Sequence, residues 1–191
     1  MEEKQDLYEE LESERLILRK IKEDDAGRLY NNIYNNYEYY KYYYQLPFDS
    51  FENYKLLVEK YKEYYENGNH FRWGIVIKET NEIIGLVQLH SRDYLNNNCQ
   101  IGYIIGYNFN NFGYAKEAVV SVINFAFEKL NIHRIDANIT EENKTSIKLA
   151  ESIGMTLEST REDGYKIGDK YYNQKVYKLI NSVKNDDNYG E

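Results

Sequence analysis

The longest regular pattern of hydrophobic positions lies after residue 113 and is helical. Apolar side chains recur there at intervals of three, four and seven residues, the spacing of a helix with one buried face. These side chains are Ala115, Ala118, Val119, Val122, Ile123, Ala126, Phe127 and Leu130. Residues 101–105 form a short, mostly apolar run between glycines, which favours a buried strand. The pattern therefore predicts a strand that leads into a long helix through the Asn-rich residues 107–112.

Shorter patterns predict the other elements. Alternating or continuous apolar runs favour strands at residues 16–21, 71–77, 83–89, 134–140, 156–166 and 170–180. Amphipathic spacing favours helices at residues 23–36, from Asp49 to a turn at residues 67–69, and at residues 142–153. Polar turns at residues 79–82 and at Gly168-Asp169 indicate two hairpins. With the central strand and helix, this order predicts an α+β domain of about seven strands and about four helices.

Two local signals refine these elements. Asp49 precedes Glu52 by the spacing of a capping box, so Asp49 is expected to cap its helix. Gly85 interrupts an apolar run, which indicates either a β-bulge or the close approach of another backbone segment.

Length and composition indicate one domain. The chain has 191 residues, 42% of them hydrophobic, and no repeat or linker divides it. We expect a disordered, charged segment at residues 1–13, an ordered domain at residues 14–180 and a polar tail at residues 181–191. No run of apolar residues is long enough for a membrane span and no secretory leader is visible, so we expect a cytoplasmic protein without a membrane partner.

Charge and cysteine content narrow the partners. A net charge of −8 argues against binding to nucleic acid and is compatible with a cationic substrate. The single cysteine, Cys99, cannot form an internal disulfide, which agrees with a reducing compartment. We interpret it as an inert thiol rather than a nucleophile, because no histidine is near it in sequence. The histidines are scattered without ligand spacing, so we expect no metal site.

The loop before the long helix is the first candidate site. Backbone N–H groups at the start of a helix lack partners within the helix, so they bind phosphate oxygens well. The loop contains neither the P-loop nor the dinucleotide-binding glycine pattern. The alternative is an ordinary connection between strand and helix that binds no ligand.

Three separated segments carry a family resemblance. The segments IGY with GYAKEAV, AFEKLNIHRIDA and EENKTSIKLAESIGM resemble the GCN5-related N-acetyltransferases (GNAT), especially the branch that acetylates ribosomal protein N-termini. The resemblance implies a mixed, mostly antiparallel central sheet with splayed central strands. In the family, a loop written [QR]-x-x-G-x-[GA] holds the pyrophosphate of acetyl-CoA through its backbone amides. The matching positions are Asn110, Asn111, Phe112, Gly113, Tyr114 and Ala115, and Asn110 departs from the pattern.

The resemblance also implies roles for residues outside the loop. Backbone groups of Tyr103, Ile104 and Ile105 would bind pantetheine and polarise the thioester carbonyl. Asn143 would contact the cofactor, and Ser146 matches a serine that protonates the departing thiolate in some ribosomal-protein acetyltransferases.

Two family side chains with catalytic roles are absent from the sequence. Ala150 occupies the position of a tyrosine acid found in many relatives, and Gln100 occupies that of a glutamate that relays a proton. Gln100 cannot act as a base. Asp93 and His90 are candidate bases upstream, and each is also compatible with an ordinary loop residue.

The expected function is transfer of an acetyl group from acetyl-CoA to a primary amine by direct attack on the thioester. Without a strong base, a protein N-terminal α-amine is favoured, because deprotonation at pH 7 requires about 1 kcal/mol for an α-amine and about 4.6 kcal/mol for lysine. The alternatives are a small-molecule acetyltransferase acting on an aminoglycoside, polyamine or other metabolite, and a non-catalytic acyl-CoA-binding module. The free edge of the terminal hairpin allows a homodimer through strand pairing.

Overall fold

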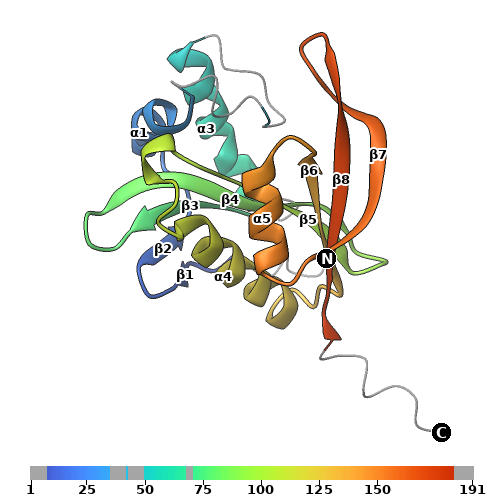
Figure 1. Cartoon of the computed structure of the whole chain (residues 1–191). Coiled ribbons are helices and arrows are strands. Elements are labelled where there is room, and N and C mark those ends of the chain that lie inside the picture. The colour runs from blue at the N-terminus through green and yellow to red at the C-terminus, as the bar shows by residue number, and fades with distance from the viewer. Residues whose placement is uncertain (1–7, 35–41, 43–49, 68–70, 183–191) are drawn as a thin grey trace, which may run out of the picture.

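The structure, a computed structural model, describes residues 8–34, 42, 50–67 and 71–182, and these form one α+β domain around a single sheet (Figure 1). The strands are β1 (Leu11–Glu12), β2 (Leu16–Arg19), β3 (Phe71–Ile77), β4 (Glu82–Asp93), β5 (Asn98–Ile105), β6 (Arg134–Thr140), β7 (Thr156–Ile167) and β8 (Lys170–Ile180). Their order is β1-β2-β3-β4-β5-β6-β8-β7, and every neighbouring pair except β5 and β6 is antiparallel. The predicted fold class is confirmed, with eight strands where about seven were expected.

The additional strand lies in the segment that we expected to be disordered. β1 pairs with β2, and the indole Nε1 of Trp73 donates a hydrogen bond to the carbonyl oxygen of Glu9 over 2.8 Å. The ring of Tyr8 stacks on Trp73 with centroids 5.3 Å apart. The prediction of disorder is therefore wrong for residues 8–13, because a few apolar side chains anchor a charged segment to the core. Residues 1–7 lie outside the described part.

The start of the predicted C-terminal tail also belongs to the domain. Asn181 is buried, and its backbone N–H donates to the carbonyl oxygen of His133 over 2.8 Å. The polar tail therefore does not begin at residue 181 as predicted, and residues 183–191 lie outside the described part.

The helices are α1 (Ala26–Leu29), α3 (Phe51–Asn67), α4 (Tyr114–Glu128) and α5 (Lys144–Ser152). A 3-10 turn precedes α1 and a π turn follows it, together covering most of the helix expected at residues 23–36. At the start of α3, the hydroxyl of Ser50 accepts a hydrogen bond from the N–H of Asn53 over 3.2 Å. The expected cap, Asp49, lies outside the described residues.

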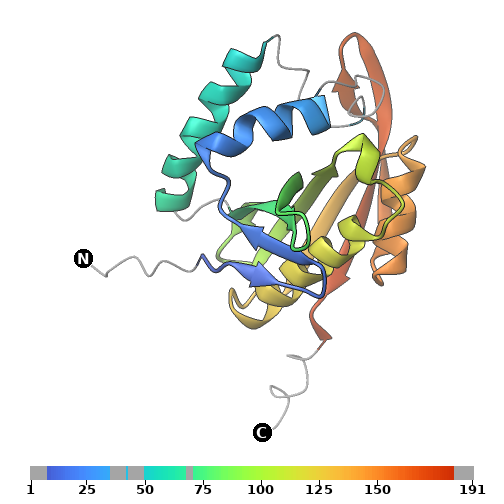
Figure 2. The ribbon, with the colours of Figure 1, turned by 90° about the vertical axis from the view of Figure 1, so that its left-hand side faces the viewer.

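The helices divide between the two faces of the sheet (Figure 2). Buried residues of α4 and α5 pack in one apolar cluster with β5 and β6, whereas buried residues of α1 and α3 form a second cluster on the opposite face. Within the described ranges, no helix is long and apolar enough to cross a membrane.

Gly85 shows both alternatives expected for it, a β-bulge and the close approach of another backbone segment. The register shifts beside it, since Ile75 pairs with Gly85 but Val76 pairs with Ile83. A Cβ atom at residue 85 would lie 2.3 Å from the carbonyl oxygen of Ile104, so only glycine fits between β4 and β5. This bulge and close contact fix β4 against the C-terminal half of β5.

The two central strands separate, as the resemblance implied. β5 and β6 pair only at Asn98–Arg134, Cys99–Ile135 and Gln100–Asp136. Beyond Gln100 the strands diverge, so backbone groups of residues 101–105 on that side have no ladder partner in β6. The divergence opens a slot through the sheet between the two helical layers.

Candidate active site

A cavity of about 790 Å³ lies where the end of β5, the loop 107–113 and the starts of α4 and α5 meet. We name it the donor cleft. Most of the predicted cofactor residues line it, namely Tyr103, Ile104, Ile105, Asn110, Asn111, Gly113, Tyr114, Ala115, Asn143 and Ser146. Phe112 is the exception, because its side chain is exposed and is not part of the lining.

The end of the loop and the first turn of α4, residues 113–116, line the donor cleft. Gly113 is the N-cap of α4 and has a φ of 83°, a left-handed conformation that favours glycine. The first turn of α4 follows, and its N–H groups at residues 114–116 have no partner within the helix. Asn110, which departs from the family pattern, donates its side-chain Nδ2 hydrogen bond to the carbonyl oxygen of Tyr107 over 3.0 Å. The Asn110 side chain thus stabilises the loop through a hydrogen bond within the loop itself.

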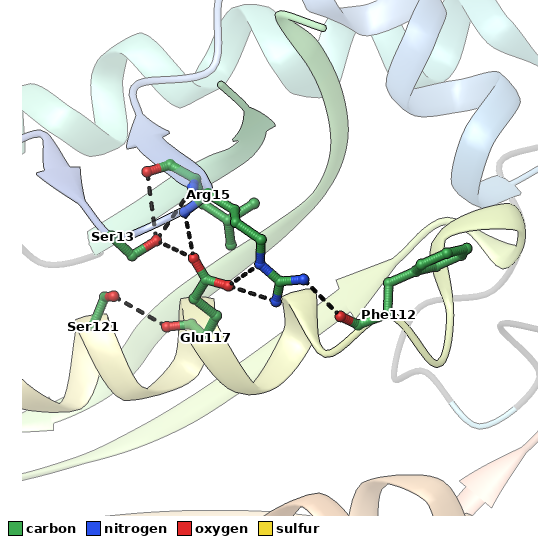
Figure 3. A network of polar contacts seen from close by, with 6 residues as sticks. Ser13, Arg15, Phe112, Glu117 and Ser121 are labelled. Carbon is green, nitrogen blue, oxygen red and sulfur yellow. Dashed lines mark hydrogen bonds and ion pairs between the residues drawn. The ribbon is translucent and has the colours of Figure 1, made fainter. Parts of the chain in front are cut away.

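A polar network holds the loop from behind (Figure 3). In the first turn of α4, Oε1 of Glu117 accepts hydrogen bonds from the hydroxyl of Ser13 and the N–H of Arg15, both over 2.8 Å. The Arg15 guanidinium donates through Nε to Oε2 of Glu117 over 2.8 Å and through Nη1 to the carbonyl oxygen of Phe112 over 3.0 Å. Arg15 therefore links the start of β2 to the residue that precedes Gly113.

The network also changes the acidity of Glu117. Partial burial by itself raises the pKa of this carboxyl, but hydrogen bonds from Arg15 and Ser13 outweigh that effect and lower the pKa below its usual value. Arg15 and Glu117 are 102 positions apart and belong to no spacing motif, so the sequence analysis did not find their pairing.

At the start of α5, Asn143 and Ser146 reach the slot between β5 and β6. The side-chain Oδ1 of Asn143 caps the helix by accepting the N–H of Ser146 over 3.1 Å. The phenol of Tyr103 donates to the hydroxyl oxygen of Ser146 over 3.1 Å. The family resemblance implies only backbone contacts for Tyr103, and Ala150 lacks the phenol that many relatives have at its position. The structure places a phenol beside Ser146 from β5 instead.

A second cavity, of about 650 Å³, is lined from both faces of the sheet, by Tyr61 and Leu86 on the side of α1 and α3 and by Val119 and Ala150 on the side of α4 and α5. We name it the acceptor cavity. It shares five lining residues with the donor cleft: Tyr42, Tyr103, Asn143, Ser146 and Leu149. Aromatic and neutral polar side chains contribute much of the rest, among them Tyr34, Tyr61, Tyr165, Gln88, Gln100, Asn138 and Gln174. Arg72 and His90 also line it, and no described lining residue is Asp or Glu.

Gln100 and Asn138 face each other where the strands begin to separate. Nδ2 of Asn138 donates to Oε1 of Gln100 over 2.9 Å. Oδ1 of Asn138 is buried and makes no hydrogen bond with a described residue. A buried carbonyl oxygen of this kind favours a ligand that brings an N–H or O–H donor.

The two candidate bases from the sequence, His90 and Asp93, lie in different surroundings. His90 lines the acceptor cavity, whereas Asp93 lines neither cavity and lies at the turn between β4 and β5. The carboxylate of Asp93 accepts hydrogen bonds from the side chain and N–H of Asn96 and from the N–H of Leu95, which lower its pKa. This geometry argues against Asp93 as a base.

Cys99 is buried in the core below the slot, and burial raises the pKa of its thiol to about 12. Its thiolate is therefore disfavoured, which agrees with the inert role expected for it.

Comparison with known proteins identifies the family. The model of the acetyltransferase (GNAT) domain matches residues 15–156. An uncharacterized N-acetyltransferase, p20, of Bacillus licheniformis is 32% identical over 172 residues, which cover 90% of this chain and 96% of the relative. The chain belongs to the GNAT acetyltransferase family.

Other GNAT relatives differ in the acceptor that their names give. Spermidine N(1)-acetyltransferase of Vibrio cholerae is 25% identical over 167 residues, covering 87% of this chain and 94% of the relative. The structure of RimL, a ribosomal L7/L12 α-N-protein acetyltransferase in complex with coenzyme A, superposes with a TM-score of 0.82 at 19% identity and covers 90% and 98% of the two chains. Family membership makes this chain an N-acetyltransferase but does not specify its acceptor. The acceptor depends on the residues that line the acceptor cavity.

Proposed function

We propose that the protein transfers the acetyl group of acetyl-CoA to the α-amine of a peptide or protein N-terminus. The observation that carries this proposal is the acceptor cavity, whose described lining contains no carboxylate to bind a cationic amine or to act as a strong base. An α-amine with a pKa near 7.8 is partly neutral at pH 7, so it needs less help with deprotonation than a lysine or polyamine.

The donor cleft fits acetyl-CoA through its backbone. The left-handed Gly113 and the free amides of residues 114–116 form a seat for the pyrophosphate at the start of α4. Residues 103–105 lie along the cleft beyond the point where the ladder with β6 ends, and their backbone amides can bind pantetheine and polarise the thioester carbonyl there. Asn143 has its side-chain oxygen occupied as a helix cap, so its amide nitrogen is the group available to the cofactor.

Ser146 and Tyr103 act together as the acid. Because the Ser146 hydroxyl oxygen accepts a hydrogen bond from Tyr103, its own proton is available to the departing sulfur. Tyr103 stabilises the serine oxygen as that proton leaves. Ala150 leaves room beside this pair rather than supplying the acid.

On the acceptor side, the amine approaches the slot past Gln100 and Asn138. The buried Oδ1 of Asn138 can accept an N–H of the amine and orient its lone pair toward the thioester. His90 is the lining imidazole suited to take up the released proton. A cytoplasmic location remains a prediction, with which the single cysteine agrees.

A panel of acceptors tests the proposal against the polyamine alternative. At pH 7, purified protein is given acetyl-CoA with unblocked peptides, with spermidine, or with an N-blocked peptide containing lysine, and thiol release is measured. We expect kcat/KM at least about tenfold higher for unblocked peptides, in line with the difference in deprotonation cost. Faster acetylation of spermidine would overturn the proposal. Acetyl-CoA binding without thiol release for any amine would instead favour the non-catalytic module.

A homodimer through the terminal hairpin remains a prediction. β7 is the edge strand, and its pairing with β8 is interrupted by two register shifts. Its exposed face carries charged side chains such as Arg161, Glu162 and Asp163. Bulges and charges are features that discourage strand addition at a sheet edge.

A further inference from the structure

Arg72 lies on β3 and lines the acceptor cavity. Its guanidinium donates through Nε to Oε1 of Gln88 over 2.8 Å and through Nη2 to the same oxygen. The guanidinium also lies over the ring of Tyr61, with its carbon 4.2 Å from the ring centroid. Gln88 and Tyr61 thus fix the side chain in one position while leaving it positively charged.

No described carboxylate forms an ion pair with Arg72, the one arginine among the described residues that line the acceptor cavity, whereas three other arginines are paired. Arg15 pairs with Glu117, Arg19 with Asp25, and Arg134 with Asp136 and Glu158. Arg72 is half-buried, and the groups that contact its guanidinium, the Gln88 amide and the Tyr61 phenol, are neutral. A partly desolvated guanidinium that faces a cavity without a counter-ion favours an anionic ligand.

The register of the sheet determines how far the Arg72 guanidinium lies from the point where the amine meets the thioester. Arg72 pairs with Gln88, and Gln88 pairs with Gly102, which precedes Tyr103. Strands in a sheet are about 4.8 Å apart, so Arg72 starts roughly 10 Å from the β5 edge where the amine meets the thioester. After allowance for the length of the arginine side chain, an anion at Arg72 lies on the order of 5–10 Å from the acceptor amine. An extended peptide spans about 3.4 Å per residue, so this distance corresponds to the second or third residue.

We propose that Arg72 binds a carboxylate of the acceptor, so that the enzyme selects α-amines that have an acidic group two or three residues away. This inference rests on the proposed function and adds the chemical class of the acceptor. The carboxylate is supplied either by an Asp or Glu side chain or by the C-terminus of a very short peptide. Planar guanidinium binds both with the same paired geometry.

Two pairs of matched peptides distinguish an acidic side chain from a free C-terminus as the source of the carboxylate. The first pair is Ala-Asp-Ala-amide and Ala-Asn-Ala-amide, and the second is Ala-Ala-Ala as free acid and as amide. For each, kcat/KM is measured in the wild-type protein, in Arg72→Gln and in Arg72→Lys. Arg28→Gln, which removes an exposed arginine of α1, is the control.

We expect the wild-type protein to prefer the acidic member of at least one pair by about tenfold or more, because a charge-assisted hydrogen bond in a half-buried site is strong. Arg72→Gln reduces that ratio to about one, Arg72→Lys retains part of it, and Arg28→Gln leaves it unchanged. The pair that shows the preference identifies the source of the carboxylate. Because each ratio is taken within one variant, a partial loss of folded protein does not alter it.

Two outcomes overturn the inference. If the wild-type protein acetylates acid and amide peptides equally, or if Arg72→Gln keeps the full preference, Arg72 does not select the acceptor although the proposed function stands. If no peptide N-terminus is acetylated while spermidine is, the proposed function and the inference both fail.

Discussion

The donor cleft and the acceptor cavity meet at the same slot but are built in different ways. The donor cleft is lined mainly by one stretch of the chain, residues 103–116, with the start of α5 beside it. The acceptor cavity is lined by residues from the π turn after α1, from α3, α4 and α5, and from strands β3 to β8. A site formed by one stretch is encoded locally in the sequence, whereas a site formed by many elements depends on how distant segments are brought together.

The largest effect is expected from Gly113→Glu in the donor cleft. A glutamate there must adopt a φ of 83° and places a negative charge at the proposed pyrophosphate seat. We expect acetyl-CoA binding to be lost, as measured by calorimetry. Gly168→Glu is the matched control, because Gly168 also has a positive φ, of 59°, but lies in the β7–β8 turn with nothing within 4 Å of its Cβ position. Unchanged affinity in Gly113→Glu would refute the position of the donor site.

A smaller effect is expected where the two regions meet. Ser146→Ala and Tyr103→Phe each remove one hydroxyl of the acid pair, and we expect kcat to fall by roughly 10- to 100-fold with little change in acetyl-CoA affinity. Because the two hydroxyls act in series, the double variant should be no slower than the slower single variant. Steady-state kinetics on all three, with the exposed Ser159→Ala as control, checks this. Additive losses would show that the two residues act independently.

The next effect concerns the support behind the donor loop. Arg15→Met removes the contacts to Glu117 and to the carbonyl of Phe112, so the loop loses its fixed position. We expect the KM for acetyl-CoA to rise by about tenfold while kcat changes less, because the network positions the seat and does not touch the reacting atoms. Lys78→Met, which breaks an exposed ion pair with Glu12, should leave both constants unchanged. A fall in kcat alone would contradict this role for Arg15.

The smallest effect is a dependence of stability on pH. The pKa of Glu117 is lowered in the folded protein, so its contribution is fully present above the unfolded value near 4.3 and is lost as pH falls through the folded pKa. Urea unfolding of the wild-type protein and Glu117→Gln should therefore show a difference in stability at neutral pH that shrinks below about pH 4. A difference that stays constant down to pH 3 would contradict the assigned ionisation.

The sequence predicted the donor region far better than the acceptor region. The periodicity of α4 and the glycine before it are local signals, and they predicted the helix and its N-terminal glycine where the structure has them. β6 was predicted at its observed bounds for the same reason. β1 was missed because a two-residue strand carries no periodicity, and its anchoring by Tyr8 and Glu9 depends on Trp73, more than sixty positions away.

The acceptor region could not be predicted because its chemistry depends on register. Arg72 and Gln88 meet only because β3 and β4 pair in a particular alignment. The phenol of Tyr103 reaches Ser146 because β5 and β6 diverge at Gln100. The net charge of −8 is compatible with a cationic acceptor, yet the described lining of the cavity contains arginine and no carboxylate. Overall charge therefore says little about the charge inside one cavity.

The most direct test of the account is an internal competition on one peptide. A peptide with a free α-amine, an acidic second residue and a downstream lysine is incubated with acetyl-CoA and the protein at pH 7, and fragmentation mass spectrometry locates the acetyl group. The account predicts acetylation at the α-amine, with the lysine unmodified at the same conversion. Preferential acetylation of the lysine would contradict it.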